Sequence, residues 1–131
     1  MKILLMTAAI LAVTGSAGAA VAQDPPPVLT VDDSLICAGV FYAQSTLPEN
    51  AGYPEGVENY RSMTRTFLTR AEILAGREGK GTDGHIERAA QVADMLIGRV
   101  DAAADAGARM TEITSWQSLE ELCISGGMQP S

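Results

Sequence analysis

The chain contains two cysteines, Cys37 and Cys123, which lie far apart in the sequence. If they form a disulfide, the segments around them must lie side by side, and the bond closes a loop of roughly 86 residues. In the chain-entropy model such a loop stabilises the folded state by about 4.5 kcal/mol, a large share of the ~5–15 kcal/mol typical of a domain. The sequence has no C-x-x-C pattern of the kind found in redox-active thiols. Whether the pair is oxidised therefore depends on the compartment in which the protein folds.

Residues 1–22 have the pattern of a secretory signal peptide. Lys2 is followed by an apolar run from Ile3 to Val13, and Ala20-Val21-Ala22 offers the small-x-small pattern at which signal peptidases cleave. Ala17-Gly18-Ala19 offers the same pattern three residues earlier. We therefore expect a periplasmic or secreted protein with its cysteines oxidised. The apolar run is too short to span ~30 Å of hydrocarbon, so no stable membrane anchor is expected after cleavage.

The mature chain is predicted to be strongly acidic. The whole chain has a formal net charge of −7, and cleavage removes one charged residue, Lys2. The expected charge after cleavage is therefore about −8, which repels polyanions and anionic surfaces. This charge argues against nucleic acid and anionic membranes as partners.

A proline-rich leader is expected over residues 23–31, where Pro25-Pro26-Pro27 fixes the backbone and removes hydrogen-bond donors. Residues 32–131 are expected to form the folded domain. Apolar residues recur there at helical spacing, and no segment keeps the period of two typical of strands. The pattern predicts an all-α domain with helices over residues 33–46, 56–77 and 84–107, and a fourth from Thr114 to about Gly126.

Two of these predicted helices carry sequence signals at their N-terminal ends. Asp32 or Asp33 is expected to cap the first helix, where a carboxylate suits the positive end of the helix dipole. Thr114 and Gln117 have the spacing of a capping box at the start of the fourth.

Short connections between these helices favour antiparallel neighbours, so the expected fold is a small up-and-down four-helix bundle. In that topology the first and last helices are adjacent. Cys37 near the start of the first helix and Cys123 near the end of the last then lie at the same end of the bundle. The sequence therefore predicts one disulfide that joins the first and last helices.

The segment from Ser34 to Pro48 carries no charged residue, and the apolar residues of the first predicted helix are distributed around its whole circumference. A helix of this kind is either buried or covered by a partner. This apolar surface is larger than a four-helix bundle of this length needs to bury. We therefore expect a contact surface for another protein or for a second copy of the chain. Four aromatic residues are expected to form it: Phe41, Tyr42, Tyr53 and Tyr60.

An acidic row on the third predicted helix consists of Glu87, Asp94 and Asp101, which recur every seven residues and so lie on one side. Such a row can attract calcium or a basic partner, although solubility is the commoner reason for it.

Few residues offer catalytic or cofactor chemistry, and no catalytic residue can be assigned. One alternative is an enzyme that uses a carboxylate such as Glu87 near His85, the only histidine, as acid or base. Another is a haem or metal-binding bundle with His85 and either Met63 or Met95 as ligands. A metal site needs three or four converging ligands, and the sequence has no such motif. We therefore expect no metal and no cofactor.

The layout of the chain, exported and helical with one disulfide and no cofactor motif, is similar to that of small periplasmic acid-stress chaperones of the HdeA type. This similarity of architecture implies a role coupled to acid. Carboxylates titrate near pH ~4, and below that the charge of the mature chain would change from about −8 to about +9. The leading hypothesis from the sequence is a non-enzymatic interaction or chaperone-like module.

Overall fold

The computed structural model describes residues 28–127. The predicted signal peptide and residues 23–27 of the leader lie outside this range. Within it the chain is helical and no strand is found. No helix of this part combines the length and the apolar character needed to cross a membrane. The elements are α2 (Val31–Thr46), the 3-10 turn η2 (Pro48–Asn50), α3 (Pro54–Arg77), α4 (His85–Asp101), α5 (Ala106–Ser115) and α6 (Gln117–Gly127).

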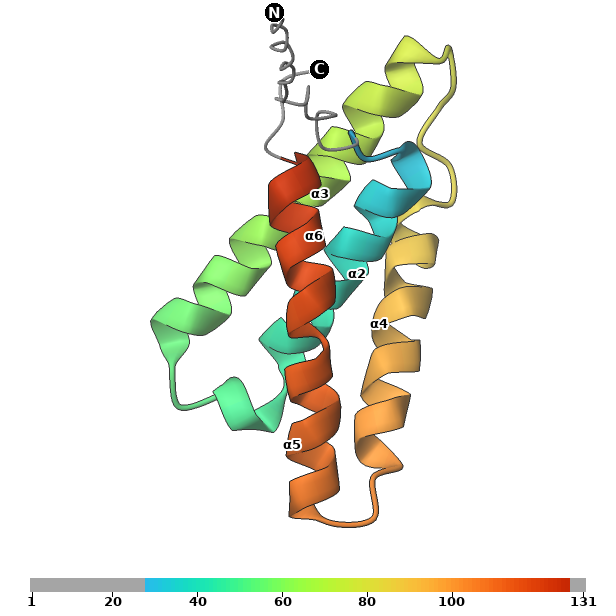
Figure 1. Cartoon of the computed structure of the whole chain (residues 1–131). Coiled ribbons are helices and arrows are strands. Elements are labelled where there is room, and N and C mark those ends of the chain that lie inside the picture. The colour runs from blue at the N-terminus through green and yellow to red at the C-terminus, as the bar shows by residue number, and fades with distance from the viewer. Residues whose placement is uncertain (1–27, 128–131) are drawn as a thin grey trace, which may run out of the picture.

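These helices form an up-and-down bundle. The directions of α2, α3, α4 and the stacked pair α5–α6 alternate along the chain (Figure 1). The disulfide between Cys37 and Cys123 joins the start of α2 to the end of α6. The predicted all-α four-helix fold and its disulfide between the first and last helices are therefore confirmed.

The central position in the bundle belongs to α2, which packs against α3, α4 and α6. Ten of its 16 residues are buried, and they are distributed around the helix. This position explains why α2 carries no charge beyond its first turn, since a charged side chain on most of its faces would be desolvated. The apolar circumference is therefore largely used within the chain, and it does not by itself require a partner.

The start of α2 differs from the prediction. The helix begins at Val31 and is capped by Thr30, not by Asp32 or by Asp33. The Thr30 hydroxyl accepts a hydrogen bond from the Asp33 backbone N–H at 3.1 Å, and the Asp33 carboxylate accepts one from the Thr30 N–H at 3.1 Å. Asp33 is thus the far half of a reciprocal capping box and lies inside the helix.

A close approach between α2 and α4 occurs at Gly39. A Cβ atom placed there would lie 2.6 Å from the carbonyl oxygen of Ala89 and 2.6 Å from the Cβ of Val92. No real Cβ tolerates such distances, so only glycine allows the two helices to approach this closely. The tight contact helps to bury the centre of α2.

The predicted boundaries of the last two helices are wrong. The predicted helix over residues 84–107 ends at Asp101, and a separate helix, α5, begins at Ala106. Asp105 caps α5, with its side chain accepting a hydrogen bond from the Ala108 N–H at 2.8 Å. Thr114 therefore lies inside a helix and is not a cap. The next helix, α6, begins after Trp116, which is almost fully buried at the junction.

The core has two parts that meet along α2. One surrounds Trp116 and Leu96 on the side of α4 and α5, and the other surrounds Phe41 and Phe67 on the side of α3 and includes Cys123 of α6. The rings of Phe41 and Phe67 stack with centroids 5.7 Å apart. Both parts of the core include residues of α2. Helices α3 and α4 are therefore each held against α2, and they make little contact with each other.

Candidate functional site

The four aromatic residues predicted to form a contact surface do not lie together. Phe41 is 3% exposed and belongs to the core, where it stacks on Tyr60 with ring centroids 6.2 Å apart. Tyr60 is half-buried beside it. Tyr53 is exposed and precedes α3. Successive residues of a helix point about 100° apart, so Tyr42 faces away from Phe41 and is 47% exposed. Of the four, Tyr42 is the one that lines one of the three hollows described below.

That hollow, here called the Tyr42 groove, lies between α3 and α4. It exists because both helices pack on α2 but diverge from each other. Its volume is about 300 Å³. Six residues from the three helices line it: Tyr42, Thr64, Leu68, Ile86, Ala89 and Ala90.

The Tyr42 groove is mainly apolar. Leu68 lies one helical turn after Thr64 on α3, and Ile86 lies one turn before Ala90 on α4, so each wall presents one face of its helix. Ile86 is 63% exposed. The Thr64 hydroxyl donates a hydrogen bond to the carbonyl oxygen of Tyr60 at 3.0 Å and is thereby satisfied. The phenol of Tyr42 is the other polar group of the lining.

Two carboxylates border the α4 wall of the Tyr42 groove. Glu87 and Asp94 are both exposed, and helix geometry places them on the side of α4 that flanks Ile86. Neither forms an ion pair with another residue of the described range. The third member of the acidic row differs, because Asp101 accepts a hydrogen bond from Arg109 at 3.0 Å. The free negative charge of the row is therefore concentrated beside the groove.

A second hollow of about 310 Å³ lies beside the disulfide, between the start of α2 and the end of α6. It is also lined mainly by apolar residues, among them Leu29, Ile36 and Leu122. It adjoins both limits of the described range, beyond which residues 23–27 and 128–131 continue the chain. A third hollow follows one exposed side of α3. The Tyr42 groove differs from the second hollow because its lining comes from three helices and does not adjoin either limit of the described range.

The residues of the predicted acid–base pair do not converge. His85 begins α4, and Glu87 follows two residues later, so their side chains leave the helix about 200° apart. Neither residue lines any of the three hollows described above. In residues 28–127 the two groups are therefore not brought together at any of these three hollows.

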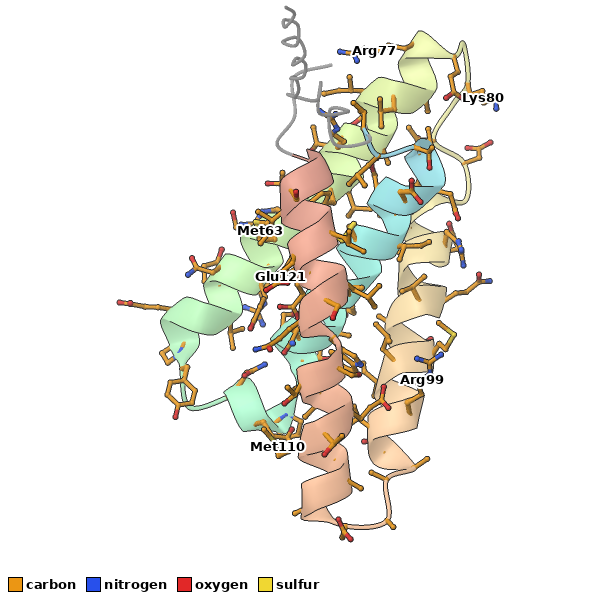
Figure 2. All side chains as sticks on the ribbon, viewed as in Figure 1. Met63, Arg77, Lys80, Arg99, Met110 and Glu121 are labelled. Atoms are coloured by element: carbon orange, nitrogen blue, oxygen red, sulfur yellow. A yellow bond between two sulfur atoms is a disulfide. The ribbon has the colours of Figure 1, made fainter. Side chains whose placement is uncertain are left out.

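The predicted haem ligands are also separated. Met95 lies ten residues after His85 on the same helix, which corresponds to about 15 Å along its axis. Met63 projects from α3 toward α6 and packs against the Phe41 cluster (Figure 2). In residues 28–127, no group of three or more His, Cys, Asp or Glu side chains is placed to hold a metal ion.

A polar network that the sequence did not predict joins α2, η2 and α6. Gln44 donates a hydrogen bond through Nε2 to the Glu120 carboxylate at 2.6 Å, and its Oε1 accepts one from Asn50 at 3.0 Å. Burial raises the pKa of Glu120, and the hydrogen bond from Gln44 opposes this effect. Burial and the nearby charge of Glu120 raise the pKa of Tyr60. The polar side chains of this network form hydrogen bonds with one another, so the network contributes to packing more than to ligand binding.

Comparison with models of known protein families gives no match, and no curated protein and no solved structure matches the chain either. The groove geometry and the sequence patterns are therefore the basis for inferring a function.

Proposed function

We propose that the protein is exported and acts as a non-enzymatic binding module that holds an apolar segment of another protein in the Tyr42 groove. The observation that carries this proposal is the exposure of Tyr42 and Ile86 on the two sides of an apolar hollow. Large apolar side chains gathered around a hollow are typical of protein-binding surfaces.

The size of the groove suits a segment of a protein chain. Its volume of about 300 Å³ is at the lower limit of ligand sites, which span ~300–1,000 Å³. A hollow between two helices that is open to solvent accommodates a few apolar side chains of an amphipathic helix. This mode of recognition uses the α3 and α4 walls as they stand, without a rearrangement of the bundle.

The lining of the groove favours binding over catalysis. Acid–base catalysis needs titratable groups within hydrogen-bond reach of a substrate. Tyr42 and Thr64 supply the polar groups here, and the Thr64 hydroxyl is already bonded to the backbone. A phenol alone can orient a ligand through one hydrogen bond, but it provides no acid–base pair.

Export is supported by the signal pattern of residues 1–22 and by the disulfide, because such bonds persist in oxidising compartments. Fractionation of the native host, followed by N-terminal sequencing, tests this part of the proposal. We expect the protein outside the cytoplasm with a new N-terminus at Gln23 or, for the earlier site, at Ala20. Recovery of uncleaved protein from the cytoplasm would contradict it.

Fluorescence of a neutral apolar dye such as Nile red tests the groove itself. A variant with Tyr42→Ser and Ile86→Ser is expected to lose most of the dye signal, because both exposed apolar walls are removed. A matched control with Tyr53→Ser and Met110→Ser removes exposed apolar side chains elsewhere and is expected to keep it. Thermal unfolding of each variant verifies that the fold is intact. Equal dye binding by both variants would show that the groove is not the apolar site.

A further inference from the structure

The charge around the Tyr42 groove differs between its two walls. On the α4 side, Glu87 and Asp94 have no ionic partner among residues 28–127. Asp101, the next acidic residue of the row, is already paired with Arg109 at 3.0 Å. The free carboxylates lie seven residues apart on one side of the helix, a separation of about 10.5 Å along its axis.

The α3 side of the groove carries no excess charge. Arg65 pairs with Glu58 at 2.9 Å, so their charges cancel. Helix geometry places Arg61 and Glu72 on the same side of α3, and these charges are also of opposite sign. The rim as a whole is therefore negative, and the negative charge is concentrated on α4. The net charge of −7 on the whole chain adds a longer-range attraction for cations.

We infer that the segment bound in the Tyr42 groove is a basic amphipathic helix with two Lys or Arg residues about seven positions apart. This inference rests on the proposed function of the groove and adds the chemistry of the partner. A helix that lies along α4 has the same rise per residue, so its residues i and i+7 reach Glu87 and Asp94 together. Its apolar side then faces Leu68 and Ile86.

The two kinds of contact have different roles. The apolar lining removes side-chain surface from water and supplies most of the attraction. The rim carboxylates are exposed, so each adds little affinity, but they distinguish basic from acidic partners and speed the encounter. An acidic helix of the same shape would be repelled by both carboxylates. The expected discrimination is therefore sensitive to salt.

Two synthetic helical peptides of about 18 residues test the inference, a length at which isolated helices begin to be stable. Both have the same Leu-rich face, and they carry either Lys or Glu at two flanking positions seven residues apart. Fluorescence anisotropy with the purified chain measures their affinities at low and high salt. At low salt we expect the Lys peptide to bind about tenfold more tightly than the Glu peptide, with a smaller difference at high salt.

Charge variants locate the effect. A chain with Glu87→Gln and Asp94→Asn is expected to bind the Lys peptide about five- to tenfold more weakly. A control with Glu55→Gln and Glu121→Gln removes equal charge from other exposed positions, one of them on α6 (Figure 2), and is expected to change the affinity less than about twofold. Equal losses in the two variants would overturn the inference, because net charge alone would explain them.

Three further outcomes separate the partner inference from the function of the groove. If both peptides bind equally and both lose affinity on Tyr42→Ser with Ile86→Ser, the inference about charge is wrong and the groove function remains. If that substitution leaves the binding of both peptides unchanged, or if neither peptide binds, the proposed function fails as well. If light scattering shows dimers that this substitution disperses, the occupant is a second copy of the chain and the inference is overturned.

Discussion

At the end of the bundle where α2 begins and α6 ends, the disulfide between Cys37 and Cys123 joins the helices. At the opposite end, where η2 lies beside the start of α5, the connection is ionic. Arg109 of α5 donates hydrogen bonds to both carboxylate oxygens of Glu49, and one more to Asp101 of α4. The same four-helix topology is thus closed by a covalent bond at one end and by charged side chains at the other.

This difference means that the two ends respond to different conditions. The disulfide stabilises the fold mainly by restricting the unfolded chain, and reductant is what removes it. The contacts of Arg109 exist in the folded state, are partly exposed, and weaken with salt. They also need an ionised Glu49, whose pKa is held below its usual range by the hydrogen bond from Arg109.

Replacement of both cysteines by alanine is expected to have the largest effect. The chain-entropy model gives a loss of about 4.5 kcal/mol in the free energy of unfolding for a loop of roughly 86 residues. Urea unfolding of the variant and of the oxidised protein measures this loss. Reductant is expected to destabilise the original chain and to leave the variant unchanged. A loss under about 1 kcal/mol would show that the disulfide end is held mainly by packing.

A substitution at Gly39 tests how much close packing adds at the disulfide end. Gly39→Ala places a Cβ 2.6 Å from the Ala89 carbonyl oxygen, so α2 and α4 must separate. We expect a loss of about 1–3 kcal/mol in urea unfolding. Gly98→Ala is the matched control, because its Cβ would meet no atom within 4 Å. That control is expected to gain about 0.5–1 kcal/mol from helix propensity. A loss confined to the control would contradict the proposed close contact.

The disulfide end was predictable from the sequence for physical reasons. Helical spacing and short connections fix an antiparallel order, and that order brings Cys37 and Cys123 to one end. The ionic end was not predictable, because Glu49 and Arg109 are 60 residues apart and belong to no motif. Asp105 falls inside the helix predicted over residues 84–107, although its side chain caps α5. Local patterns therefore predicted the helices better than the contacts between their ends.

The candidate site was predicted only in part. Tyr42 was among the expected contact residues, but Phe41 was placed on the same surface although it is in the core. An uncharged, apolar helix has the same sequence pattern whether its own chain or a partner covers it. The groove depends on the divergence of α3 from α4, and this follows from how each packs on α2. No pattern within one helix encodes that geometry.

The ionic end is tested by Arg109→Met, which removes the charge and keeps much of the side-chain length. We expect a smaller loss of stability than for the disulfide, and one that shrinks in high salt. The pKa of Glu49 is lowered in the folded state. The stability that the ionised Glu49 contributes is therefore fully present at pH values above the usual pKa of a carboxyl group, and it is lost as the pH falls through the lowered pKa. The difference in urea midpoint between the variant and the original chain should therefore decrease toward pH 3.

The control for Arg109→Met is Arg99→Met, which removes an exposed charge from α4 (Figure 2). It is expected to leave the urea midpoint nearly unchanged at every pH. If both variants lose the same stability, or if the effect of Arg109→Met is independent of salt, the contacts of Arg109 do not hold this end.

The smallest expected effect is at Glu120, whose pH response is opposite to that of Glu49. Burial raises the pKa of Glu120 in the folded state. Ionisation of this group therefore lowers the stability of the fold at pH values above the raised pKa, and this loss is absent at pH values below the usual pKa of a carboxyl group. Glu120→Gln keeps a side-chain oxygen that accepts from Gln44 and should raise the melting temperature at pH 8 by at most about 3 °C, because solvent screens a half-exposed group. At pH 4 the gain should vanish.

The control is Glu121→Gln, one residue later and exposed, which is expected to show no such dependence on pH. A gain of equal size at both pH values would mean that packing, and not charge, limits this junction.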